Sequence, residues 1–169
     1  MKKTNYIIVV ILMALPIWSA AQSITSSKHN LSVDGSFPVK ATTESEICIF
    51  CHTPHNSAPR SPLWNKADNG VTYVLYNSST IDATLGQPDG SSILCLSCHD
   101  GTIALGEIVS RSTAIDMANP LTQRSNLSTD LSNDHPVSFV YDAALATTDG
   151  QLKTPPLQNV RLDINSKLQ

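Results

Sequence analysis

All four cysteines of this 169-residue chain lie in two copies of one short pattern. The first copy is CIFCH at 48–52 and the second is CLSCH at 95–99. In each copy two thiols stand three residues apart, so one helical turn brings them to the same face. That spacing lets both thiols reach the two vinyl groups on one edge of a porphyrin, with the next histidine under the iron. The pattern is typical of covalent c-type haem attachment.

Two haems are therefore predicted, each held by one motif. The predicted attachment thiols are Cys48, Cys51, Cys95 and Cys98, and the predicted proximal iron ligands are His52 and His99.

Three other uses of paired cysteines fit less well. A disulfide within Cys-x-x-Cys closes a very small ring and is usually redox-active, not structural. A zinc site of four thiolates normally has about 15–20 residues between its pairs, fewer than separate Cys51 from Cys95. A thioredoxin-like redox site needs a βαβ context, and the sequence offers none.

The rest of the chain predicts a poor conventional core. Aromatic residues make up 5% of the sequence and charged residues 15%, and ten prolines cut helices short. Few large apolar side chains are available to offset the conformational entropy of folding. We therefore expect a mostly irregular, small α+β fold, with short helical turns and few strands wrapped around two covalently attached c-type haems.

The expected elements are few and short. Strands are predicted at 71–76 and 137–141, helical turns at 47–52, 93–99 and 142–146, loops at 77–92 and 111–134, and a polar connection at 147–158.

The N-terminus is typical of a secretory signal peptide. Lys2 and Lys3 precede an apolar run at 6–15, Pro16 ends the run, and small residues follow up to Ala21. We expect cleavage after Ala21, giving a signal peptide at 1–21 and a dihaem cytochrome c domain at 22–169. An uncleaved anchor is the alternative, but the run is short of the about 20 residues that span a membrane.

The expected destination is periplasmic or extracellular, with no membrane span after cleavage. The net charge of −3 also argues against a nucleic-acid partner, which normally meets a basic surface.

The motifs and their flanking strings resemble the exported multihaem cytochromes c with doubled CxxCH motifs. The strings are ICIFCHTPHNSAP, SPLWN, LCLSCHDGTIALG and HPVSF, and the likeness runs from about 29 to 141. The resemblance implies a bis-histidine electron carrier. Such chains often carry further CxxCH motifs after the HPVSF-like segment, where this sequence has none. The sequence is thus that of a short dihaem member or of a truncated chain.

Candidate distal ligands follow from counting donors. Only Met117 remains once the signal is removed, so methionine cannot serve both irons. Three histidines stand outside the motifs: His29, His55 and His135. Pro136 holds His135 extended, which fixes the approach of its ring, and the resemblance also implies a ligand there.

The other two candidates lie closer to the N-terminus. An iron bond to His29 is one way to tie down a segment that would otherwise be disordered. His55 follows His52 by three residues, so both rings leave on the same side of a helical turn. His55 would then serve a different haem, such as the one on Cys95 and Cys98.

Three distal histidines exceed what two irons in one chain need. One is spare, or it reaches a haem of another subunit in a head-to-tail assembly, or it binds a haem on a missing C-terminal part.

Two axial imidazoles would leave no open coordination position, so the expected function is electron transfer to redox partner proteins, without catalysis. The acidic mature chain suits partners with basic patches. The alternative is a haem enzyme, of peroxidase or nitrogen-oxide reductase type, or a small-ligand sensor, with one open or labile distal site.

Overall fold

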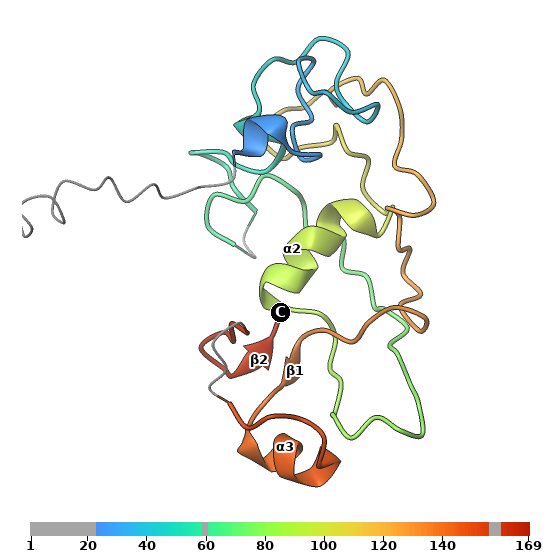
Figure 1. Cartoon of the computed structure of the whole chain (residues 1–169). Coiled ribbons are helices and arrows are strands. Elements are labelled where there is room, and N and C mark those ends of the chain that lie inside the picture. The colour runs from blue at the N-terminus through green and yellow to red at the C-terminus, as the bar shows by residue number, and fades with distance from the viewer. Residues whose placement is uncertain (1–22, 59–60, 156–159) are drawn as a thin grey trace, which may run out of the picture.

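The computed structural model describes residues 23–58, 61–155 and 160–169. The signal peptide expected at 1–21 lies outside these residues. In chain order the elements are the 3-10 helices η1 (Ile24–Ser26) and η2 (Cys48–Phe50), helix α2 (Gly90–His99), strand β1 (Phe139–Val140), helix α3 (Ala143–Asp149) and strand β2 (Lys167–Leu168). Helix α2 crosses the middle of the molecule, between the N-terminal loops at one end and α3 at the other (Figure 1). No helix in the described ranges is long and apolar enough to cross a membrane.

The helical predictions are confirmed with shifted boundaries. Helix α2 begins at Gly90, three residues before the expected start, and η2 forms within the turn predicted at 47–52. Helix α3 begins after Asp142, whose side chain accepts a hydrogen bond from the Leu145 N–H, and ends at Gly150 with φ of +73°. These two caps explain why a seven-residue helix can stand alone between proline-rich segments.

One strand prediction is confirmed and the other is wrong. Strand β1 lies within 137–141 and pairs antiparallel with β2, a partner that was not predicted. Segment 71–76 forms only one bridge, between Val74 and Asp130. On its other edge the Gln87 side-chain amide accepts from Tyr73 N–H at 2.8 Å and donates to Tyr73 C=O at 3.0 Å. A side chain thus takes the place of a neighbouring strand.

The core consists of two small hydrophobic clusters, and each contains part of one cysteine motif. The first cluster has Leu31, Ala41, Phe50, Ile108 and Ile115, and the second has Tyr73, Ile93, Leu96 and Leu131. Phe50 is 1% exposed and Leu96 is 4% exposed. Each motif is therefore fixed to the protein by a residue between its cysteines.

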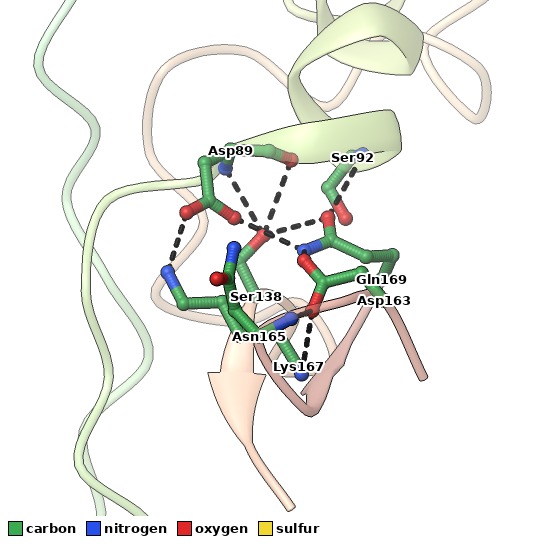
Figure 2. Close-up of polar contacts among 7 residues, drawn as sticks. All are labelled: Asp89, Ser92, Ser138, Asp163, Asn165, Lys167 and Gln169. Atoms are coloured by element: carbon green, nitrogen blue, oxygen red, sulfur yellow. Dashed lines mark hydrogen bonds and ion pairs between the residues drawn. The ribbon is translucent and has the colours of Figure 1, made fainter. Parts of the chain in front are cut away.

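The last residues of the chain are fastened to the start of α2. Figure 2 shows the Gln169 amide surrounded by Asp89, Ser138 and Asp163. Its nitrogen donates to Asp89 Oδ1 at 3.1 Å and to Asp163 Oδ2 at 3.0 Å. Lys167 forms an ion pair with Asp89. This network holds the helix that carries the second motif against the β1–β2 pair.

Removing the charge of Asp89 tests the network. The pKa of Asp89 is lowered, mainly by the hydrogen bond from Lys167. A carboxyl whose folded-state pKa is depressed stabilises the fold above its unfolded pKa of about 4, and that stabilisation is lost as the pH falls through the folded value. Asp89→Asn should lower the free energy of unfolding by about 0.5 kcal/mol at pH 7, a small effect because the pair is partly exposed.

Urea denaturation of both proteins at pH 7 and pH 3 measures this difference, which should shrink at the lower pH. In a Lys167→Met background, Asp89→Asn should lower the free energy of unfolding by a smaller amount. A difference that is equal at the two pH values would contradict the assigned role of the ion pair.

Candidate functional site

The first cysteine motif occupies a single tight turn. The N–H groups of Cys51 and His52 both donate to the Cys48 carbonyl, at 3.2 and 2.8 Å. The turn exposes Cys48 and leaves Cys51 half-buried. Because Phe50 points into the first cluster, the first thiol of the motif stands free at the surface for covalent chemistry.

The second motif has the same exposure pattern on a regular helix. It forms the last part of α2, in which Leu96 and Ser97 are buried, Cys95 is exposed and Cys98 is half-buried. The thiols three residues apart on one helix have the spacing expected for attachment to one porphyrin edge.

A buried carboxylate closes the end of α2 directly after His99. Asp100 is 3% exposed, and its Oδ2 accepts from the Tyr73 hydroxyl at 2.6 Å. Its Oδ1 accepts from Thr102 N–H at 2.9 Å and forms a tight turn at 100–102. A negative charge is unfavourable at a helix C-terminus, so these bonds compensate the placement and fix the helix end.

The His99 ring is held in one tautomer. Its Nδ1 lies 2.6 Å from the Ser125 carbonyl oxygen. A carbonyl only accepts, so Nδ1 carries a proton, and in the neutral ring the lone pair is then on Nε2. Metal-binding histidines usually donate their other ring N–H in this way. The residues around His99 therefore suit it as an iron ligand.

A second imidazole faces this ring. The centroids of His29 and His99 lie 6.2 Å apart with their planes at 84°. Metal–nitrogen bonds of about 2 Å place two axial imidazoles about 6 Å apart, centroid to centroid, across one metal. An edge-to-face ring contact falls in the same range. The separation thus fits a bis-histidine iron, and the Ser125 bond is the independent feature that favours ligation.

His29 is held in place by its neighbour. Asn30 is 4% exposed, and its side chain donates to the Thr25 carbonyl at 2.8 Å and accepts from Ser32 Oγ at 2.7 Å. The N-terminal segment is therefore ordered by protein contacts, and an iron bond is not needed to tie it down.

His135 is exposed and lies at the meeting of two cavities. One cavity, of about 450 Å³, is also lined by Cys95, His99 and Leu131. The other, of about 490 Å³, is also lined by Tyr76 and Phe139. His135 therefore shares a cavity with the second motif, and its Nδ1 lies 3.3 Å from the neighbouring Pro136 carbonyl.

The remaining histidines lie at the first motif. The His52 ring packs edge-to-face on Trp64, with centroids 5.9 Å apart. His55 is exposed, and its carbonyl accepts from Thr53 Oγ1 at 2.6 Å. The ring that faces His99 is therefore that of His29, and the expectation that His55 serves the second haem stays a prediction.

The cysteine thiols form no disulfide bonds with one another. All four cysteines are free. Burial raises the pKa of Cys51 and of Cys98, which keeps both as neutral thiols at neutral pH. In the described ranges no three histidine, cysteine or acidic side chains gather into a group able to hold a metal ion.

Sequence reasoning missed the segment that joins the two motifs, which we call the connector and define as Trp64, Asn65 and Lys66. Trp64 Nε1 donates to Ser97 Oγ at 3.2 Å, inside the second motif. Asn65 N–H donates to the Cys51 carbonyl at 3.0 Å, inside the first. The only signal was the string SPLWN, noted for its resemblance and not for any contact.

No model of a known protein family matches this chain, and no curated protein sequence matches it. The residues and contacts above therefore carry the functional argument.

Asn30→Ala should loosen the segment that presents His29. Loss of the side-chain bonds leaves buried Ser32 without its acceptor, at a cost of about 1–3 kcal/mol. Faster amide exchange over residues 25–32 would measure this loosening. Asn119→Ala is the matched control, because the Asn119 side chain is exposed and donates to the Pro38 carbonyl. Equal exchange in the two variants would contradict the anchoring role of Asn30.

Proposed function

We propose that this chain is an exported, multihaem electron-transfer cytochrome c that carries two covalently attached haems. The observation that carries the proposal is the repeated motif on two helical turns, each with an exposed first thiol and an anchored interior residue. Cys48 and Cys51 would hold one haem, and Cys95 and Cys98 the other. When bound, haem supplies an iron that exchanges one electron.

The protein's own residues would position and insulate the group. Phe50 and Leu96 fix the two motifs to separate hydrophobic clusters. Ser125 and Asp100 fix His99, the first through its ring and the second through the helix end. A site that is held rigid changes little between oxidation states, which suits electron transfer.

For the second haem we propose His99 and His29 as the axial pair. The 6.2 Å separation and the tautomer of His99 support it. With two imidazoles bound, substrate has no open position, and the potential is expected to lie below that of a methionine–histidine pair.

For the first haem the proximal ligand would be His52. His55 leaves the turn on the same side as His52, and His135 lines a cavity with Cys95 and His99. We therefore propose a histidine of a second copy for the distal position, which gives a head-to-tail assembly. The proposed setting is the periplasm or the extracellular space, with redox partner proteins that carry basic patches.

A haem enzyme or small-ligand sensor is the second candidate function. It is favoured by one observation: among the ring contacts of the described residues, the neighbour of His52 is Trp64 and not an imidazole. An open or displaceable position at that iron would admit a small ligand.

The experiment is maturation of the full chain in a host that exports and attaches haem c, followed by mass measurement and visible spectroscopy. Two haem masses and a fully low-spin spectrum are expected, with no carbon monoxide bound after reduction. His29→Ala should convert one haem of two to high spin, because the second iron loses an axial nitrogen. His55→Ala and His135→Ala, measured in the same way, identify the ligand of the other iron.

Colourless protein with free or oxidised thiols would reject the proposal. A high-spin fraction in the unmutated protein, with carbon monoxide binding, would instead favour the function of a haem enzyme or small-ligand sensor. A low-spin His29→Ala protein would reject the His29–His99 pairing alone.

A further inference from the structure

Lys66 is a fully buried cation. Its exposed fraction is 0%, and its Nζ donates to three backbone carbonyls: Ala104 at 3.0 Å, Leu105 at 2.6 Å and Glu107 at 2.8 Å. An unpaired charge is very costly to bury, so a position like this one needs full hydrogen bonding. Lys66 has it without a carboxylate partner among these three contacts.

The geometry of the contacts defines the charge state. An ammonium has three N–H donors, whereas a neutral amine has two. Three carbonyl acceptors around one nitrogen are therefore satisfied only by the protonated form. Burial lowers the pKa of Lys66, and the charge of Glu107 acts in the opposite direction.

The charge lies between the two cysteine motifs. The preceding residue, Asn65, bonds the Cys51 carbonyl, and Trp64 bonds Ser97 beside Cys98. Asn65 also donates from its side chain to the Ile49 carbonyl. The carbonyls of Ala104 and Leu105 that hold the ammonium belong to the loop that lines a cavity with Cys98.

The Lys66 charge affects the pKa of the second cysteine thiol in each motif. Burial raises the pKa of Cys51 and of Cys98, and the Lys66 ammonium opposes the rise at each of them. Cys51 belongs to the first motif and Cys98 to the second, so one cation acts at both proposed attachment points.

We infer that Lys66 is a fixed positive charge shared by the two haem sites, which raises the reduction potential of both. The inference rests on the proposed function and deepens it. Each iron gains one electron on reduction, supplied by a one-electron donor, and its positive charge falls by one unit. The Lys66 ammonium disfavours the more positive, oxidised form at both sites and so favours reduction.

The effect should be large for a single residue. Once the cysteines are thioethers, they carry no negative charge to offset the ammonium. A unit charge about 10 Å away in a protein interior, at an effective dielectric constant of about 20, changes a one-electron equilibrium by about tenfold or more. Lys66 is a positioning and tuning residue here, since it binds neither haem nor partner.

The test compares matured full-length proteins by spectroelectrochemical titration. Lys66→Met keeps an unbranched side chain out to Cε and removes the charged ammonium, and both midpoint potentials should fall by about a tenfold change in the reduction equilibrium. Lys66→Arg, which keeps the charge, should stay closer to the unmutated protein. Lys40→Met is the matched control, because Lys40 also donates to two carbonyls, of Val33 and Gly35. It should leave the potentials unchanged.

Haem count and low-spin spectra separate this inference from the proposed function. If the unmutated protein holds no haem, the proposed function fails. If all variants hold two low-spin haems and Lys66→Met has unchanged potentials, the inference fails and the function stands.

Lys66→Met leaves three carbonyls without a donor and could prevent maturation. If Lys66→Met does not mature, Glu107→Gln tests the inference, because Glu107 is exposed and its charge is opposite to that of Lys66. It should raise both potentials, by less than the Lys66 substitution lowers them. Unchanged potentials in that variant would overturn the inference.

Discussion

Hydrogen bonds from the side chains of Trp64, Asn65 and Lys66 connect the two cysteine motifs and the loop at 104–110. Trp64 donates to Ser97 Oγ, Asn65 donates to the Ile49 carbonyl and to Ser110 Oγ, and Lys66 donates to the carbonyls of Leu105 and Glu107. Asn65 and Lys66 are 0% exposed, so every unmade bond of their side chains would carry the full cost of a buried polar group. Two hydrophobic clusters, each too small to define a domain, are thereby combined through polar contacts. The positions of both motifs depend on this arrangement.

The proposed haem attachment also depends on a small number of buried contacts. A chain with little regular structure can still present two short turns rigidly if each turn has one buried anchor, here Phe50 and Leu96. The first thiol of each turn is left exposed for covalent attachment. A covalently held group would then complete the interior, and the protein would supply orientation, insulation and charge. The Lys66 charge is the contribution that we propose links the electrostatics of both sites.

The elements best predicted from sequence are those set by local chemistry. The helical turns at the two motifs and the strand at 139–140 follow from residue type and spacing. The strand prediction at 71–76 was wrong because residue type does not specify a pairing partner, and on one edge Tyr73 is bonded by the Gln87 side-chain amide and not by a strand. Strand β2 was missed because Lys167–Leu168 has no pattern of its own, and its partner strand, Phe139–Val140, lies far away in the sequence.

The amino-acid sequence alone determined the two Cys-x-x-Cys-His motifs, and from them came the predictions of two attached haems, of proximal histidines and of three candidates for the distal positions. Only the tertiary structure decided which histidine faces which. His29 lies opposite His99 although 70 residues separate them along the chain. It also gave Lys66 its place between the motifs. The place of Lys66 depends on long-range hydrogen bonds, whose partners leave no periodic trace in a sequence because any backbone carbonyl can accept them.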